Sequence, residues 1–129
     1  MDRLRVLVVD DERPLQELLL NALEEAGFAV EVSATGDDAI EHLERQDPAY
    51  VALVTDIQLT PSGATGWDVA RRARELDGAL PVIYMTGAAA ADWPSNGVPN
   101  SILVTKPFAP SQIVTAVSQL LNSGGEAAS

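Results

Sequence analysis

Short apolar runs alternate along this chain with longer amphipathic stretches, and this alternation restricts the fold more than any other feature of the sequence. Continuous apolar runs that are too short for helices are typical of strands covered on both faces of a parallel sheet. Such runs occupy residues 5–9, 51–55, 81–85 and 101–105. Residues 28–32 (FAVEV) instead alternate between apolar and polar side chains, which predicts an edge strand with one face in water.

Helical spacing of apolar residues, at i, i+3 and i+4, marks the stretches between the runs. These stretches are residues 15–26, 39–43, 69–76 and 113–121. Pro14 and Gly27 predict the start and the stop of the first helix, and Thr35 is the expected cap of the second. The segment 88–100 contains two prolines and a glycine after residue 93, so it has room only for a short fourth helix or turn.

The element order is therefore a βα unit repeated five times. Parallel strands need crossover helices, so this order predicts a doubly wound α/β sandwich. The chain of 129 residues has the size of one domain. We expect the domain to span residues 1–122 and the small, polar residues 123–129 to form a disordered tail.

Charge and residue content exclude several classes of function. The 19 acidic and 8 basic residues give a formal charge of −11, which disfavours direct nucleic-acid binding. The absence of cysteine excludes disulfides, thiolate zinc sites and cysteine nucleophiles. No stretch is typical of a signal peptide or a membrane span, so we expect a cytoplasmic protein without membrane contact.

Polar residues follow four of the apolar runs. They are Asp10, Asp11 and Glu12 after the first run, Asp56 after the third, Thr86 and Gly87 after the fourth, and Lys106 and Pro107 after the fifth. The carboxyl ends of parallel strands meet at one edge of the sheet, so these side chains are expected to converge there. Asp10 and Asp11 could instead merely cap the first helix, but the register of Asp56 and Lys106 favours a shared site.

Converging carboxylates repel one another, so a cation has to offset their charge. Oxygen ligands without histidine or cysteine favour Mg²⁺. A carboxylate at such a site can act as a nucleophile and form an aspartyl phosphate. The Lys106 ammonium, the Thr86 hydroxyl and nearby backbone N–H groups are then the expected partners of the phosphoryl oxygens.

The motif VLVVDDE, the apolar run that leads into Asp56, and the motifs MTG and TKPF occur in that order. Together they closely resemble the response regulator receiver family, over about residues 3–121. The resemblance implies a flavodoxin-like sheet in the order 2-1-3-4-5 and phosphorylation of Asp56. It also implies that Asp10 and Asp11 organise Mg²⁺, with Asp56 and the backbone carbonyl of Gln58 as further ligands.

The same resemblance assigns the remaining residues of the edge. Thr86 corresponds to the hydroxyl residue that moves toward the phosphate, Lys106 to the lysine that pairs with it, and Pro107 to the proline of a cis Lys–Pro bond. Leu103 occupies the position where the family commonly has a tyrosine or phenylalanine that changes rotamer with the threonine. Tyr84 lies on the same strand face as Thr86 and could substitute, although a core tyrosine is the favoured interpretation.

Two further features depart from the family pattern. The segment after Asp56, IQLTPSGATGW, is longer than usual, and the fourth helix is short, so both the docking of a kinase and the output surface can differ. The three arginines of the third helix, Arg71, Arg72 and Arg74, are expected to form a solvated face.

We therefore predict a single-domain response regulator without an output domain. It accepts a phosphoryl group from a histidine kinase or a histidine phosphotransfer protein and is a phosphoacceptor that catalyses its own modification and hydrolysis, rather than an enzyme with a separate substrate. It acts as a signalling switch or phosphorelay intermediate, through an unknown downstream protein or a homodimer.

Two alternatives remain at this point. A haloacid-dehalogenase-type phosphatase also uses a strand-end aspartate and Mg²⁺, but it needs a D-x-D pattern on the first strand and a cap domain, and the adjacent pair Asp10–Asp11 breaks that pattern. A pseudo-receiver that never accepts phosphate and acts only as an interaction module is the other, and Leu103 keeps it open.

Overall fold

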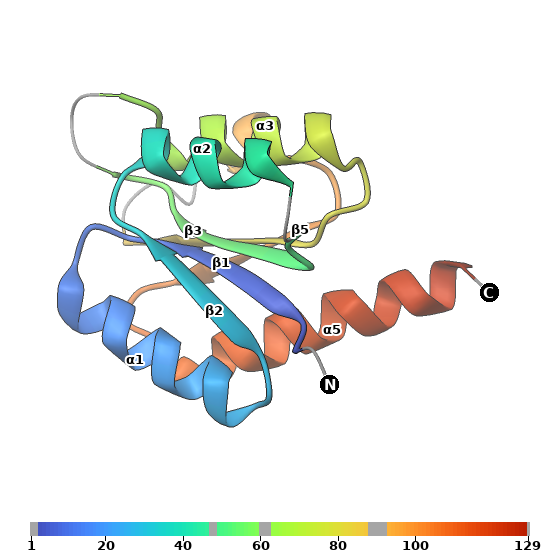
Figure 1. The fold of residues 1–129 in the computed structure, drawn as a ribbon, viewed down its shortest axis with the longest axis horizontal. Coiled ribbons are helices and arrows are strands. Elements are labelled where there is room, and N and C mark those ends of the chain that lie inside the picture. Colours follow the sequence, from blue (N-terminus) through green and yellow to red (C-terminus); the bar gives the residue numbers. More distant parts are fainter. Residues whose placement is uncertain (1–2, 47–48, 60–62, 88–92, 129) are drawn as a thin grey trace.

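A five-stranded parallel sheet lies between two layers of helices in the computed structural model, which describes residues 3–46, 49–59, 63–87 and 93–128 (Figure 1). The strands lie in the order β2-β1-β3-β4-β5, which confirms the predicted flavodoxin-like topology. They are β1 (Arg5–Val9), β2 (Ala29–Ser33), β3 (Ala52–Asp56), β4 (Val82–Thr86) and β5 (Ser101–Thr105). The helices are α1 (Arg13–Glu25), α2 (Gly36–Arg45), α3 (Gly66–Leu76), α4 (Trp93–Asn96) and α5 (Pro110–Ala128).

Alternate residues of the central strands form two separate cores. Val6 and Val8 of β1 point toward the layer of α1 and α5 and pack with Leu19 and Leu23. Residues such as Leu7 point the other way and pack under α2 and α3. The two helical layers lie on opposite faces of the sheet in Figure 1, because consecutive side chains of a strand point to opposite faces.

Three strands, β2, β3 and β4, begin and end one residue later than the strands predicted from the sequence. Strand β3 ends at Asp56 and β4 ends at Thr86, whereas the sequence pattern placed both residues just after a strand. The parallel ladder explains the difference, since Asp56 is paired with Met85, and Thr86 with Thr105. Both polar side chains are therefore held by strand backbone rather than by a loop.

Strand β5 is less buried than its apolar sequence predicted. Its residues are half-buried up to Val104, and Thr105 is exposed. The prediction of a strand covered on both faces was wrong here, because β5 is the last strand of the sheet and α4 spans only four residues. The short fourth helix itself was predicted correctly, while residues 88–92 lie outside the described part of the chain.

Helix starts follow the predicted local chemistry. The hydroxyl of Thr35 accepts a hydrogen bond of 3.1 Å from the backbone N–H of Asp38 and caps α2. Pro14 lies in the first turn of α1, and Gly27, just past its end, has φ +102°, a conformation that favours glycine.

Among the described residues, no helix combines the length and apolarity that a bilayer crossing requires.

Helix α5 is longer than expected. It continues to Ala128, so residues 123–128, which the sequence pattern marks as a disordered tail, have helical backbone. Gly124 and Gly125 have low helix propensity, which is why the apolar periodicity did not extend the helix through them. In Figure 1 the end of α5 projects beyond the sheet. The domain boundary at residue 122 stays a prediction, and Ser129 lies outside the described residues.

Candidate functional site

Four acidic residues meet at the carboxyl edge of the sheet. Asp10, Asp11 and Glu12 follow β1 and Asp56 ends β3, and each contributes a carboxylate oxygen that lies within 4.8 Å of the others. Asp10 and Asp56 are buried, whereas Asp11 and Glu12 are exposed. The structure thus confirms the prediction that the side chains at these two strand ends lie close together.

Asp10 is the most enclosed of these acids. Its side chain is fully buried, and its Oδ1 accepts a hydrogen bond of 2.7 Å from the backbone N–H of Glu12. Burial raises the pKa of Asp10 to about 6, although the Glu12 N–H and the Lys106 ammonium oppose the rise. Within the described part of the chain its Oδ2 has no hydrogen-bond donor, since Lys106 Nζ lies 3.6 Å away.

Capping of α1 does not explain Asp10 and Asp11. The N-cap of α1 is Glu12, and its side chain makes no capping hydrogen bond. A buried carboxylate oxygen without a donor is costly, and a hard cation shared with the neighbouring acids would satisfy it. The metal ligand atoms that the four acids offer are all carboxylate oxygens, the type that Mg²⁺ prefers. The residues present therefore fit this metal.

The ammonium group of Lys106 lies close to three of the four carboxylates. Its Nζ is 3.3 Å from Asp56 Oδ2, 3.4 Å from Glu12 Oε1 and 3.6 Å from Asp10 Oδ2. Burial alone lowers the pKa of Lys106, but the carboxylates of Asp10 and Asp56 outweigh it, so that the pKa lies above its ordinary value. The ammonium therefore stays charged and holds a fixed place beside Asp56.

The Asp56 carboxylate is also buried and largely desolvated. Burial raises its pKa, and Lys106 opposes that rise by charge and by a hydrogen bond. The backbone N–H of Gln58 also lowers the pKa of Asp56, while the Gln58 side chain is exposed. The Asp56 carboxylate is therefore desolvated, with the Lys106 ammonium and the Gln58 N–H stabilising its charged form.

A glycine makes the geometry beneath Asp56 possible. The N–H of Gly66 donates to the carbonyl of Ile57 over 3.0 Å and brings the start of α3 under the end of β3. A Cβ on Gly66 would lie 2.1 Å from the carbonyl oxygen of Asp56. Only glycine allows this approach, and the sequence motif TGW did not reveal it.

The other predicted residues lie as follows. Thr86 is 1% exposed at the end of β4, and its carbonyl accepts a hydrogen bond of 2.7 Å from the N–H of Lys106. The Lys106–Pro107 bond is cis. Leu103 lies in the middle of β5, half-buried and paired in register with Tyr84, and Tyr84 is a fully buried core residue.

Sequence reasoning missed two contacts. The exposed Glu12 forms an ion pair with Lys106, although an acid at a helix start gives no sign of such a distant partner. Arg74 is not part of a solvated face: it is half-buried, and its guanidinium donates to the carbonyls of Leu80, Pro99 and Asn100. Contacts between side chains and a distant backbone have no signature in the local sequence pattern.

Comparison with known proteins identifies the family. The sequence model of the response regulator receiver domain matches residues 6–118. This chain belongs to the response regulator receiver family. The response regulator receiver protein CpdR of Brucella abortus is 34% identical over 119 residues, a match that covers 91% of this chain and 96% of CpdR.

Solved structures and longer relatives agree with this assignment. A response regulator receiver protein from Sinorhizobium medicae has 44% sequence identity and a TM-score of 0.89, over 95% of this chain and 97% of that one. The transcriptional regulatory protein CusR of Escherichia coli is 28% identical over 123 residues, a match that covers 94% of this chain and 52% of CusR. The family assignment removes the support for a dehalogenase-type phosphatase, whereas the pseudo-receiver alternative depends on chemistry that only an experiment can test.

Proposed function

We propose that this receiver domain accepts a phosphoryl group on Asp56 from a phosphohistidine of a histidine kinase or histidine phosphotransfer protein. One observation carries the proposal: the Asp56 carboxylate is buried, lies 3.3 Å from the Lys106 ammonium and belongs to a cluster of four acids at the sheet edge. Several carboxylates that converge on one ammonium, with two of them desolvated, are typical of functional sites.

The transfer exchanges one bond for another. An Asp56 carboxylate oxygen attacks phosphorus as the phosphorus–nitrogen bond to the donor imidazole breaks, and the imidazole leaves with the electron pair and takes up a proton. Lys106 is already within contact distance of the carboxylate that becomes the acyl phosphate, and we assign the Thr86 hydroxyl to a second phosphoryl oxygen. Hydrolysis of the acyl phosphate by water later restores the carboxylate.

Asp10, Asp11, Asp56 and the backbone carbonyl of Gln58 would hold Mg²⁺. When bound, the ion neutralises phosphoryl oxygen charge. The buried Asp10 Oδ2, which has no donor among the described residues, supports this role, as does the all-oxygen ligand set.

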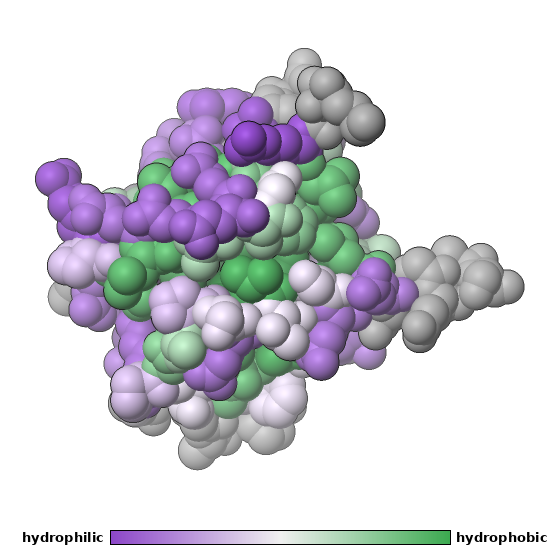
Figure 2. All heavy atoms as spheres, turned by 90° about the horizontal axis from the view of Figure 1, so that it is seen from below, coloured by the Kyte–Doolittle hydropathy of each residue, from purple (hydrophilic) through white to green (hydrophobic). Residues whose placement is uncertain are grey.

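Phosphorylation adds charge and acceptor oxygens to the buried edge, which biases the loops after β3 and β4 between two states. We propose that the receiver acts as a signalling switch or a phosphorelay intermediate through protein contacts, with a downstream protein or with a second copy of this chain. Figure 2, which views the molecule from the side of α1 and α5, shows hydrophobic residues interspersed with hydrophilic ones.

Intact-mass measurement after incubation with Mg²⁺ and acetyl phosphate tests the proposal. The unmodified protein should gain one phosphoryl group, and Asp56→Asn should gain none. Glu24→Gln, which removes an exposed acid at the end of α1, is the matched control and should be modified like the wild type. If no phosphoryl group is gained from acetyl phosphate or from phosphorylated histidine kinases, the domain is a pseudo-receiver and the proposal is wrong.

A further inference from the structure

An aromatic side chain lies beside the site on β4 instead of β5. Tyr84 precedes Thr86 by two residues, so both side chains point to the same face of the sheet. It is fully buried, and in the ladder its partner on β5 is Leu103. The strand position opposite Leu103 therefore carries the ring that Leu103 lacks.

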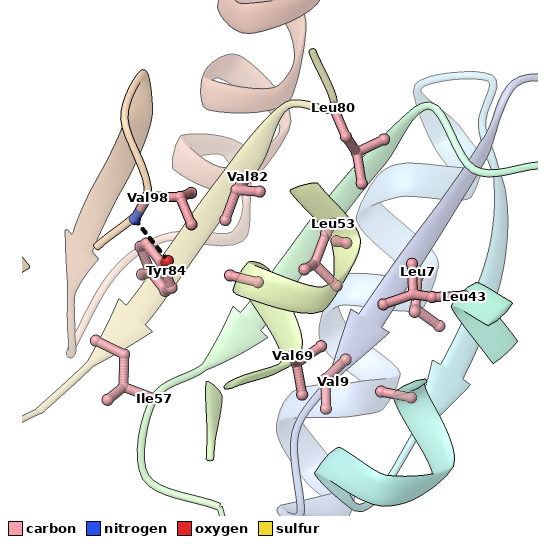
Figure 3. Packing of buried hydrophobic residues seen from close by; sticks show 13 residues of the cluster. Leu7, Val9, Leu43, Leu53, Ile57, Val69, Leu80, Val82, Tyr84 and Val98 are labelled. Carbon is pink, nitrogen blue, oxygen red and sulfur yellow. Dashed lines mark hydrogen bonds between the residues drawn. The ribbon is translucent and has the colours of Figure 1, made fainter. Parts of the chain in front are cut away.

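The Tyr84 hydroxyl contacts the segment between α4 and β5. It accepts a hydrogen bond of 3.1 Å from the backbone N–H of Val98 (Figure 3). The Tyr84 ring also packs against Trp67 of α3, with centroids 4.8 Å apart and planes tilted by 57°. Since Tyr84 is enclosed on all sides, it has no room to change rotamer independently of these neighbours.

Residues 97–100, here termed the α4–β5 connection, are held mainly by side chains from elsewhere. Ser101 Oγ accepts a hydrogen bond of 3.0 Å from Trp93 Nε1 and donates one of 2.7 Å to the Val98 carbonyl. On the α3 side, Arg74 donates to the carbonyls of Pro99 and Asn100. The Val98 N–H, in contrast, is bonded to β4 through Tyr84, so this bond joins the connection directly to the strand that carries Thr86.

We propose that Tyr84 is a positioning residue that couples the state of the site to the α4–β5 connection through its hydrogen bond with Val98. The inference rests on the proposed function, because the signal begins with occupation of Asp56. A shift of Thr86 toward Asp56 displaces the end of β4, and the packed Tyr84 ring passes that displacement to the Val98 N–H. The chain achieves this coupling with a tyrosine that stays buried and a leucine across from it.

A core role alone predicts a different behaviour. If Tyr84 only fills space and satisfies one buried N–H, then loss of its hydroxyl lowers stability and leaves the response of the connection to the site unchanged. If Tyr84 is the link, loss of the hydroxyl separates the two events, so that the site still binds its ligand while the connection no longer responds.

Beryllofluoride with Mg²⁺ serves as the probe for the occupied site, and fluorine NMR reports its binding, with Asp56→Asn as the negative control. The chain has two tryptophans, so Trp67→Phe leaves Trp93 of α4 as the only emitter while an aromatic ring remains beside Tyr84. In this background, we expect beryllofluoride to change the Trp93 emission, and Tyr84→Phe to bind beryllofluoride but lose at least about half of that change.

Arg74→Gln is the matched control. It loosens the same connection from the α3 side and leaves the Tyr84–Val98 bond in place, so it should retain the emission change. An equal emission change in Tyr84→Phe, or an equal loss in Arg74→Gln, overturns the inference.

Amide hydrogen exchange of the unmutated protein gives a test that needs no variant. Beryllofluoride should alter the exchange rate of the Val98 N–H by about fivefold or more, the low end of usual couplings between sites. An unchanged rate at Val98 with beryllofluoride bound contradicts the inference. Absence of any bound fluorine signal contradicts the proposed function instead, so the two failures are distinguishable.

Discussion

Replacement of Asp10 by asparagine should stabilise the metal-free protein, although it removes a central residue of the site. Asp10 is fully buried, and its Oδ2 has no hydrogen-bond donor within the described residues. The folded state therefore carries the cost of a desolvated charge. Asparagine keeps an acceptor for the Glu12 N–H and removes the charge, so the penalty is relieved in the folded protein.

The magnitude follows from the pKa of Asp10. A rise from 3.8 to about 6 corresponds to about 3 kcal/mol at pH 7, because one pKa unit is worth about 1.4 kcal/mol. The buried amide N–H₂ has to find partners of its own, so we expect Asp10→Asn to raise the free energy of unfolding by about 1–3 kcal/mol. The melting temperature should rise by about 3–10 °C.

The effect should depend on pH with a definite sign. Above pH 6 the Asp10 carboxyl is ionised in both the folded and the unfolded chain, and the whole penalty is present. Below pH 3.8 it is protonated in both, and the penalty disappears. The stability gain of Asp10→Asn over the wild type should therefore be largest near pH 7 and shrink through this window as the pH falls.

Urea unfolding in EDTA, followed by circular dichroism at several pH values, measures the gain. The matched control is Asp11→Asn, which removes an exposed acid of the same cluster and should change stability by less than about 0.5 kcal/mol. Addition of Mg²⁺ should stabilise the wild type more than Asp10→Asn, because binding to the folded state alone adds to its stability. A variant less stable than the wild type in EDTA at pH 7, or a gain independent of pH, refutes the desolvated-charge explanation.

Three further substitutions test contacts around the site. Gly66→Ala should cost about 1–3 kcal/mol in urea unfolding, because its Cβ meets a carbonyl oxygen at 2.1 Å, whereas Gly78→Ala, whose Cβ has its nearest neighbour at 3.9 Å, should unfold like the wild type. Arg74→Gln should lower the unfolding free energy by about 1–3 kcal/mol, since three carbonyls lose a charged donor. Arg72→Gln, which breaks only surface ion pairs, should cost less than about 1 kcal/mol, and the reverse order would contradict a stabilising role of the three Arg74 hydrogen bonds. Lys106→Met should slow phosphorylation by acetyl phosphate at least about tenfold, as measured by the intact mass over time. An unchanged rate would show that Lys106 does not take part in the reaction.

Local chemistry in the sequence was sufficient for the architecture and for the position of the site. Short apolar runs and helical stripes determine which segments become strands and helices, and parallel strands bring their carboxyl ends to one edge. The adjacency of Asp10 and Asp11, the strand before Asp56 and the lysine after the last run therefore predicted a common site. The prolines and the glycine of residues 94–99 likewise limit the length of α4, because backbone restrictions act within a few residues.

Only the tertiary structure decided how the site is connected to the rest of the molecule. The ion pair of Glu12 with Lys106, the carbonyl contacts of Arg74 and the bond between Tyr84 and Val98 join residues that are far apart in sequence. Such contacts depend on how helices and loops pack against the finished sheet. Hydropathy periods and capping motifs describe one element at a time, so they contain no information about which distant backbone group a side chain will meet.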